Sequence, residues 1–335
     1  MCVKNSLCVI PGDGIGKEVI PAAVEVLKKT IPGLQIIEAE AGWDCFLKQG
    51  VSVPEKTLES IRSCGAALFG AVSSPSKKVA GYRSAIITMR QELDLYSNIR
   101  PVHSQPRVSS RQDVDIILVR ENTEGLYSGR EHFTNGEAIA ERVITEQASR
   151  RIARRAVELA GLLGRKRLTI IHKANILPLT DGLFRDSVRL EIEEIAHSHY
   201  LLIDEQLVDS AAFKLVNDPA SFDMIVTTNL FGDILSDLAS YWCGGLGLAP
   251  SLNWGEGIAV AEPVHGSAPD IAGKGIANPM AAILSAALLA RYIWILPKIA
   301  DQIENAVART LEEGIGIKPG EKTDVILTAI LDNLL

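Results

Sequence analysis

The stretch DMIVTTNLFGDILSDLASYWCGG, residues 223–245, brings together a strand pattern and a helix pattern. Its apolar start, Met224 to Val226, predicts a buried strand. A helical pattern follows Thr228-Asn229. Within it Asp233 and Asp237 stand four residues apart, so that both carboxylates project from one face of the helix. The stretch therefore predicts a buried strand that leads into a helix with two neighbouring acidic side chains.

Two like charges at this spacing cost roughly 0.2–0.5 kcal/mol on an isolated helix, and a divalent cation would turn that cost into a gain. Carboxylate oxygens suit Mg²⁺ or Mn²⁺. From the spacing alone, a solvated acidic helix face is the more common explanation. The apolar residues Leu230, Ile234, Leu235 and Leu238 predict a mostly buried helix, whose carboxylates need a partner, and this favours the cation.

Strand and helix patterns alternate along the chain, which predicts an α/β protein with a parallel sheet. Gly12, Gly14 and Gly16 follow the first strand and invite a dinucleotide-binding interpretation, but Lys17 stands where the fingerprint needs Gly or Ala. The Walker pattern fails as well. Further strands are predicted at 7–10, 35–40, 65–72, 115–119, 168–172 and 201–208, and helices from the first glycines to about 29, near 55–63 and at about 146–163.

Composition sets the class of protein. The chain has 335 residues, enough for two domains, and its net charge of −7 argues against a nucleic-acid partner. Five scattered cysteines without a CxxC pair are typical of a reduced, cytoplasmic protein. The start of the chain has no signal-peptide pattern, and residues 280–296 are too short for a membrane span and predict a buried helix. His197 and His199 are interpreted as surface residues.

Basic residues fall beside predicted strand ends. Each of Arg90, Arg100 and Arg120 alone would be a surface ion-pair residue, but together they suggest a cluster that binds carboxylates. Lys173, at the end of a buried strand, is either catalytic or paired with a nearby carboxylate. Residues 73–84 predict an exposed loop, and residues 128–142 a projecting hairpin or arm.

The Gly- and Pro-rich loop from Glu262 to Gly273 precedes a helix that Asn278 and Pro279 are expected to cap, and such a loop can cradle a nucleotide. His265 alone would more often be structural. The turn-rich segment 244–250 predicts a flexible crossover.

Seven motifs together resemble the β-decarboxylating dehydrogenases, the family of isocitrate, 3-isopropylmalate, homoisocitrate and tartrate dehydrogenases. The resemblance covers nearly the whole chain. It implies the two-domain isopropylmalate/isocitrate dehydrogenase-like α/β fold with a large mixed sheet, which is not a classical Rossmann fold. The motifs are PGDGIGKEV, DLYSNIRPV, VRENTEGLY, HKANILPLTDGLF, NLFGDILSD, GGLGLAPS and EPVHGSAPDIAGKGIANP.

The resemblance also implies how the chain is divided. Residues 1–100 plus 246–335 would form a discontinuous cofactor-side domain. Residues 101–245 would form the substrate, metal and dimerisation domain, with its arm near 128–142. The active site would lie between the domains of a homodimer, or of a tetramer built from dimers, and would take residues from both subunits.

By the same resemblance, Asp233 and Asp237 would bind Mg²⁺ or Mn²⁺, with Asp209 supplied by the second subunit. Lys173, also from the second subunit, would accept the hydroxyl proton of the substrate, and Tyr127 would protonate the carbon left after CO₂ departs. The residues expected to bind substrate are Ser84, Arg90, Arg100, Arg120 and Asn175.

NAD is the expected cofactor rather than NADP, because a carboxylate at Asp270 would bind the ribose hydroxyls and repel a 2′-phosphate. This too follows from the resemblance. The remaining cofactor-binding positions would be His265, Gly266, Ser267, Ala268, Ile271 and Asn278.

The expected substrate is a small di- or tricarboxylic hydroxy acid. The residues before Arg90 look most like those of homoisocitrate dehydrogenases, because Arg83 and Ile86 stand where isopropylmalate enzymes have Glu and Leu, and Ser84 matches the isocitrate enzymes while Ile86 does not. The expected reaction is the conversion of homoisocitrate to 2-oxoadipate in amino-acid biosynthesis. The alternatives are 3-isopropylmalate in leucine biosynthesis and isocitrate. A non-catalytic regulatory subunit is disfavoured, because the lysine, tyrosine and aspartates are all present.

Overall fold

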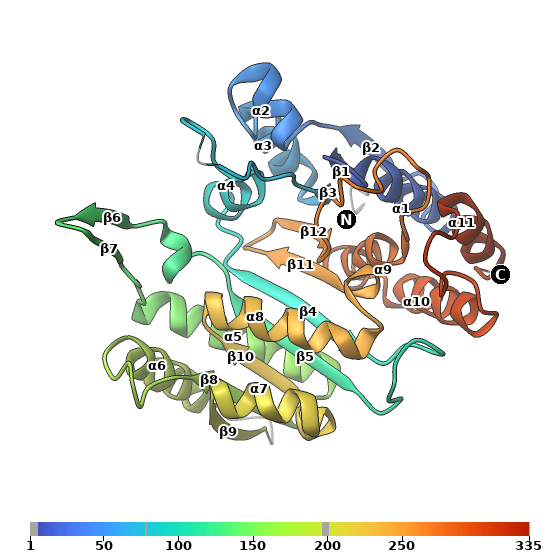
Figure 1. The fold of residues 1–335 in the computed structure, drawn as a ribbon. Helices are drawn as coiled ribbons and strands as arrows, with labels where there is room; N and C mark the ends of the chain where they lie inside the picture. Colours follow the sequence, from blue (N-terminus) through green and yellow to red (C-terminus); the bar gives the residue numbers. More distant parts are fainter. Residues whose placement is uncertain (1–5, 78, 196–200, 335) are drawn as a thin grey trace. The chain divides into compact units, whose positions relative to one another are not determined.

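The computed structural model describes residues 6–77, 79–195 and 201–334, so that His197 and His199 lie outside the described residues. The chain forms two compact units (Figure 1). Unit 1 comprises Met1–Leu95, Ser104–Gln112 and Trp242–Leu335, and unit 2 comprises Tyr96–His103 and Asp113–Tyr241. The assignment of one domain to cofactor and the other to substrate stays a prediction.

Five strands of unit 1 run in the order β2-β1-β3-β12-β11, parallel except for the antiparallel β11–β12 pair. The glycine-rich turn follows β1, and helix α1 buries Val19, Ala23 and Val26 at helical spacing. The strands of unit 1 are β1 Ser6–Gly12, β2 Gln35–Glu38, β3 Ala66–Ala71, β11 Pro250–Trp254 and β12 Ala259–Pro263, and its helices are α1 Gly16–Thr30, α2 Trp43–Gln49, α3 Glu55–Cys64, α4 Ala85–Glu92, α9 Met280–Leu288, α10 Pro297–Glu312 and α11 Thr323–Asp332.

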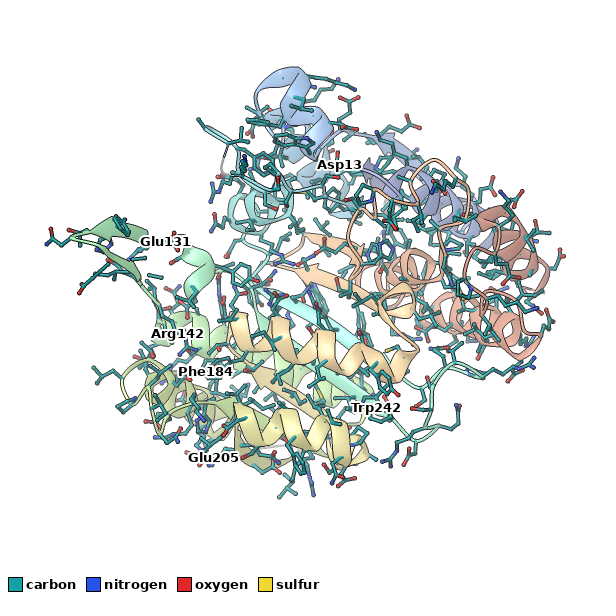
Figure 2. The ribbon with its side chains drawn as sticks, viewed as in Figure 1. Asp13, Glu131, Arg142, Phe184, Glu205 and Trp242 are labelled. Atoms are coloured by element: carbon teal, nitrogen blue, oxygen red, sulfur yellow. The ribbon has the colours of Figure 1, made fainter. Side chains whose placement is uncertain are left out.

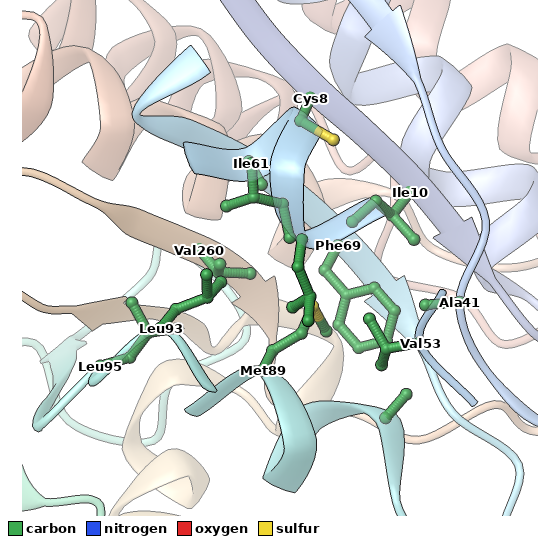
Figure 3. Close-up of a cluster of buried hydrophobic side chains, with 13 residues drawn as sticks. Cys8, Ile10, Ala41, Val53, Ile61, Phe69, Met89, Leu93, Leu95 and Val260 are labelled. Atoms are coloured by element: carbon green, nitrogen blue, oxygen red, sulfur yellow. The ribbon is translucent and has the colours of Figure 1, made fainter. Parts of the chain in front are cut away.

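An aliphatic core cluster in unit 1 joins the strands to helices α3 and α4 (Figure 3). Ile10 of β1 and Phe69 of β3 are fully buried in it, together with Ile61 of α3 and Met89 of α4. Burying one such side chain contributes about 1.5–3 kcal/mol. Because Met89 lies in this core, the next residue, Arg90, is held at a fixed place on α4.

Unit 2 has strands in the order β4-β5-β10-β8-β9, parallel except for the antiparallel β4–β5 pair. The predicted strand at 224–226 is β10, and its neighbours on both sides are parallel to it. The strands of unit 2 are β4 Ser97–His103, β5 Asp115–Glu121, β6 Glu131–Thr134, β7 Glu137–Ala140, β8 Arg167–His172, β9 Leu202–Leu207 and β10 Met224–Thr227, and its helices are α5 Glu146–Leu163, α6 Thr180–Ile195, α7 Val208–Asn217 and α8 Asn229–Ala239.

The predicted arm is an antiparallel hairpin of β6 and β7, which extends outward in Figure 1. Every residue of the two strands is exposed, including Phe133 and Ile139. Its base is tied by the bridge between Gly125 and Val143. The hairpin therefore has no hydrophobic core of its own within the described chain.

Three local expectations are corrected. Helix α8 is not mostly buried: Ile234 is 56% exposed, because the inner face of the helix carries small and polar residues such as Gly232 and Ser236. Helix α9 starts at Met280, one residue later than predicted, and a short π-helical turn, Leu289–Ile293, ends it. The crossover at 244–250 contains a 3₁₀ turn, Leu246–Leu248.

The predicted α/β fold class is confirmed, since each unit contains a five-stranded mixed sheet together with helices among the described residues. In that part of the chain no helix combines the length and the apolar character that a membrane crossing requires.

Candidate active site

The first component of the site is an arginine that lies against helix α8. Arg120, at the end of β5, is fully buried, and its Nε and Nη2 donate to Oδ1 of Asn229 at 3.1 and 2.7 Å. Its Nη1 forms an ion pair with Asp233. The side chain passes over Gly232, where a Cβ atom would lie 2.6 Å from its Cγ. The glycine is thus needed for the close approach of strand β5 and helix α8.

Arg100 of β4 reaches the same helix one turn further on. Its Nη1 donates to Oγ of Ser236 at 2.6 Å and to Oδ1 of Asp237 at 2.8 Å. Its Nη2 lies 3.5 Å from Oδ1 of Asp233, and its Nε is held by Asn98. Arg100 and Arg120 therefore share Asp233, as two members of the predicted arginine cluster.

Tyr127 closes this cluster from the 3₁₀ turn Leu126–Ser128. Its hydroxyl donates to Oδ2 of Asp233 at 2.5 Å. The guanidinium of Arg120 lies over its ring, 5.1 Å from the centroid, in a cation–π contact. A phenol that is bonded to a carboxylate and lies under a guanidinium group is placed to donate or accept a proton.

The donor set of α8 fits a hard divalent cation. The side chains of Asp233 and Asp237 are 33% and 54% exposed, while those of the two arginines behind them are almost fully buried. Burial, and then the charge of Asp233, raise the pKa of Asp237 against the opposing effect of Arg100. Two carboxylates with substrate oxygens and waters are a normal Mg²⁺ ligand set. No group of three or more His, Cys, Asp or Glu side chains is placed to hold a metal within the described chain.

Lys173 and Asp209 form a pair of their own. Nζ of Lys173 lies 2.6 Å from Oδ1 of Asp209, and this bond lowers the pKa of the carboxyl. Their side chains are 24% and 62% exposed, so the ammonium is less accessible than the carboxylate. The paired-lysine interpretation thus holds within one chain. The assignment of both residues to the active site of a second subunit stays a prediction.

The backbone of Lys173 is fixed by an ion pair that the sequence did not reveal. Its N–H donates to Oδ2 of Asp181 at 2.6 Å, and Asp181, fully buried at the start of α6, is paired with Arg142. Nη2 of Arg142 also donates to Thr228 at 3.1 Å, and its guanidinium lies over the ring of Phe231. Figure 2 labels Arg142 at the base of the hairpin. Arg142 therefore links the base of the hairpin, Lys173 and the start of α8.

Arg90 makes its contacts inside unit 1. Its Nε donates to Oδ1 of Asn253 at 3.0 Å and its Nη2 to Oε1 of Glu262 at 3.1 Å. Ser84 stands just before α4, and its side chain makes no capping hydrogen bond there. Asn175 is exposed in the turn after Lys173. The structure thus brings Arg100, Arg120, Tyr127, Asp233 and Asp237 together, and it places Arg90 with Glu262 in unit 1.

The predicted cofactor loop follows β12. Burial lowers the pKa of His265, whose Nδ1 lies 3.0 Å from the carbonyl oxygen of Gly266 and whose buried Nε2 has no hydrogen-bond partner among the described residues. Ser267 is 8% exposed, and its hydroxyl accepts from that of Ser73 at 2.9 Å. Ala268 has φ of +39°, a conformation that costs a non-glycine residue roughly 1–2 kcal/mol.

Further along this loop, Asp270 is exposed and Ile271 is half-buried. Oδ1 of Asn278 accepts from the N–H of Met280 at 3.0 Å, and its amide donates to the carbonyl of Gly316 at 3.1 Å. Asn278 therefore joins the start of α9 to the segment before α11.

Residues 6–326 match the family described as isocitrate/isopropylmalate dehydrogenase. An isocitrate/homoisocitrate dehydrogenase of Thermus thermophilus is 55% identical over 309 residues, 92% of this chain and 91% of that protein. A homoisocitrate dehydrogenase of Methanocaldococcus jannaschii is 50% identical over 90% of this chain and 88% of its own length. The crystal structure of an isocitrate dehydrogenase from Methylococcus capsulatus superposes with a TM-score of 0.92 at 40% identity, covering 98% and 99% of the two chains. The chain therefore belongs to the isocitrate/isopropylmalate dehydrogenase family and is a dehydrogenase.

Proposed function

We propose that this enzyme catalyses the NAD- and Mg²⁺- or Mn²⁺-dependent oxidative decarboxylation of homoisocitrate to 2-oxoadipate. The observation that carries the proposal is the joint placement of Arg100, Arg120 and Tyr127 against Asp233 and Asp237. Bidentate guanidinium groups bind carboxylates, aspartates on one helix face bind a hard cation, and a phenol transfers protons. An oxidative decarboxylation of a hydroxy acid with a 3-carboxylate uses all three.

In this proposal the arginines bind substrate carboxylates. Arg90 supports the assignment, because Asn253 and Glu262 occupy its Nε and Nη2 and leave Nη1 without a partner among the described residues. When bound, the cation would supply a Lewis acid beside the hydroxyl of the substrate. Tyr127 would give its proton to the carbon that has lost CO₂, and Asp233 orients its hydroxyl for that transfer.

The uncharged amine form of Lys173 would accept the hydroxyl proton in the active site of the second subunit. Asp181 holds its backbone, and Nζ of Lys173 lies 2.6 Å from the carboxylate of Asp209. A lysine with a fixed backbone and a single carboxylate partner can be placed with little loss of entropy when substrate binds. Asn175, two residues further on, would meet substrate from the same exposed turn.

NAD rather than NADP is the proposed cofactor. The exposed carboxylate of Asp270 can bind ribose hydroxyls and would repel a 2′-phosphate. The same loop would bind the rest of the dinucleotide through His265, Gly266, Ser267, Ala268, Ile271 and Asn278.

The choice of homoisocitrate is supported by the residues before Arg90 and by two relatives whose names include that substrate. The hydroxyl of Ser84 is not used as a helix cap, and Arg83 lies 4.0 Å from Glu92 in a loose, exposed pair. Both side chains can therefore turn to a distal carboxylate at small cost. Ile86 has an apolar side chain, so it offers no hydrogen bond to the substrate.

A homodimer is the proposed assembly. Phe213 and Val216 of α7 and Ile234 and Leu238 of α8 are exposed on neighbouring helices of unit 2. Exposed apolar side chains that gather on adjacent elements mark protein–protein contacts. The uncovered hairpin supports the same assembly, since a lone two-stranded hairpin is marginal in water.

The test measures NAD reduction with Mg²⁺ and compares kcat/KM for homoisocitrate, isocitrate and 3-isopropylmalate, with the best acid repeated with NADP. We expect homoisocitrate to lead by about tenfold or more, which corresponds to about 1.4 kcal/mol. A lead for 3-isopropylmalate or isocitrate would overturn the substrate assignment and retain the chemistry. Lys173→Ala is expected to abolish turnover with retained fold, with Lys166→Ala as the matched control. Turnover unchanged by Lys173→Ala would overturn the proposed role of the lysine.

A further inference from the structure

The glycine-rich turn between β1 and α1 connects two loops, residues 73–84 and residues 264–276, by hydrogen bonds. Asp13 is 2% exposed, and its carboxylate accepts three backbone N–H groups: from Trp43 at 2.7 Å, from Asp44 at 3.0 Å and from Ser73 at 2.9 Å. Figure 2 labels Asp13 in unit 1. This one carboxylate therefore holds both the start of α2 and the first residue of the loop 73–84.

The same turn holds the predicted cofactor loop at two points. The N–H of Ile15 donates to the carbonyl of Ser267 at 2.9 Å, and a Cβ at Gly14 would lie 2.1 Å from that oxygen. One helical turn later, Oε1 of Glu18 accepts the N–H of Gly273 at 2.6 Å. The loop is thus fixed to the start of α1 near both of its ends.

The two loops also meet directly. The hydroxyl of Ser73 donates to that of Ser267 at 2.9 Å. Tyr82, near the far end of its loop, donates to the carbonyl of Ser73 at 3.1 Å and packs edge-on against Trp43 and Phe46, with ring centroids 5.0 and 5.2 Å apart. Loop 73–84 is therefore attached at both ends to groups that Asp13 orients.

This arrangement also accounts for the glycines that failed the dinucleotide fingerprint. The N–H groups of Asp13, Ile15 and Gly16 already donate to the carbonyls of Ala71, Ser267 and Asp13. A phosphate-binding turn needs such groups free to meet the ligand. The glycines instead allow the backbone of the turn to approach its two neighbours closely.

We propose that Asp13 is a positioning residue that couples substrate binding to cofactor binding, through the turn that joins loop 73–84 to loop 264–276. The proposal rests on the proposed function, which assigns the first loop to the hydroxy acid and the second to NAD. Because each loop is tied to the same carboxylate or the same turn, ordering one loop lowers the entropy cost of ordering the other. Such coupling is positive and reciprocal.

The test uses the full chain with NADH and the preferred hydroxy acid, a combination that binds but cannot react. NADH affinity is measured by fluorescence with and without the acid, and the ratio is the coupling factor. Asp13→Asn keeps the shape of the side chain but offers one acceptor oxygen to three donors. Asp44→Asn is the matched control, since that carboxylate pairs with Lys17 at the surface.

We expect Asp13→Asn to reduce the coupling factor about fivefold or more, while Asp44→Asn leaves it unchanged. Glu18→Ala is expected to weaken NADH binding alone, and Tyr82→Phe to weaken binding of the acid alone. If Asp13→Asn does not fold, Ser73→Ala takes its place, because it removes the hydroxyl bond between the loops. A coupling factor equal to that of the parent enzyme in the folded Asp13 or Ser73 variant would overturn the proposal.

Hydrogen exchange separates this inference from the proposed function. Without ligands, we expect Asp13→Asn to lose amide protection relative to the parent enzyme at residues 71–77 and at residues 264–276. The loss should occur in both loops. If the parent enzyme turns over none of the three acids but Asp13→Asn shows this loss of protection in both loops, the proposed substrates are wrong and the coupling through Asp13 stands. If the parent enzyme is active but Asp13→Asn leaves the protection of both loops unchanged, the coupling is wrong and the proposed function stands.

Discussion

The hydroxyl of Tyr127 donates to Oδ2 of Asp233 at 2.5 Å, while Oδ1 of the same carboxylate is paired with Arg120. The phenol is therefore oriented by the aspartate that is proposed to bind the cation. Tyr127→Phe is expected to lower kcat about 10²–10⁴-fold with little change in KM, because the ring and its contact with Arg120 remain while the proton donor is lost. Steady-state kinetics on the preferred acid measure this, and a kcat within threefold of the parent value would contradict it.

The buried ion pair of Asp181 and Arg142 fixes the backbone position of Lys173. Asp181→Asn leaves Arg142, whose side chain is 13% exposed, without its counter-charge. We expect the free energy of unfolding to fall by about 3 kcal/mol, measured by urea denaturation, with kcat reduced as well. Asp186→Asn, which affects an exposed pair with Arg185, serves as the control and should cost less than about 1 kcal/mol. Equal effects of the two substitutions would remove the positioning role.

Gly232 and Gly182 offer a matched pair of helix substitutions. A Cβ at Gly232 would lie 2.6 Å from Cγ of Arg120, whereas one at Gly182 would meet nothing within 4 Å. Gly232→Ala is therefore expected to cost about 1–3 kcal/mol of stability and to displace Arg120. Gly182→Ala is expected to add about 0.4–1 kcal/mol. Thermal unfolding measures both, and two changes of the same sign would show that the close packing of Arg120 is unimportant.

Stability should depend on pH through Glu124. Burial, and then the charge of Glu121, raise the pKa of Glu124 to about 7. The folded chain therefore binds more protons than the unfolded chain between about pH 4.5 and 7, so the free energy of unfolding falls as pH rises through this window. The effect is on the order of 1 kcal/mol after allowance for solvent screening. Glu124→Gln should flatten the slope and Glu131→Gln should not; urea denaturation at a series of pH values decides.

Cation binding should stabilise the folded chain. At 100 times its dissociation constant, Mn²⁺ adds about 2.7 kcal/mol, which raises Tm by several degrees. The rise should disappear in Asp233→Asn and in Asp237→Asn and remain in Asp186→Asn. Because the pKa of Asp237 is raised, protons should compete with the cation as pH falls. A Tm rise that survives both α8 substitutions would place the cation elsewhere.

Apolar runs made most of the buried strands predictable, as with Met224 to Val226. Strands β4, β11 and β12 were not predicted. Strands β4 and β11 bury polar residues such as Asn98 and Asn253, which bond to arginines rather than contributing to an apolar pattern, and β12 has only five residues. The helical spacing of Asp233 and Asp237 predicted their shared face, but not the exposure of Ile234 beside them. Ile234 is exposed because the buried face of α8 is formed by other residues. On that face Gly232 has no side chain, and Arg120 occupies the space that a larger side chain would fill.

The family motifs supplied the candidate residues, and the structure supplied their partners. Arg142 and Asp181 are 39 residues apart, and nothing in their local patterns reveals the pair. Asp13 lies within the motif PGDGIGKEV, where no local pattern distinguishes it from a surface aspartate. Its role depends on three backbone N–H groups from distant segments, which only the folded chain brings together.

The uncovered hairpin of β6 and β7 has a practical consequence for handling the enzyme. Its strands lie between Arg130 and Arg142, both of them trypsin sites, and no other element covers them within the described chain. Proteases cut where backbone can open locally at little cost. Cleavage at Arg130 should therefore slow as protein concentration rises, so that a simple digestion series becomes a gauge of how much of the enzyme is assembled.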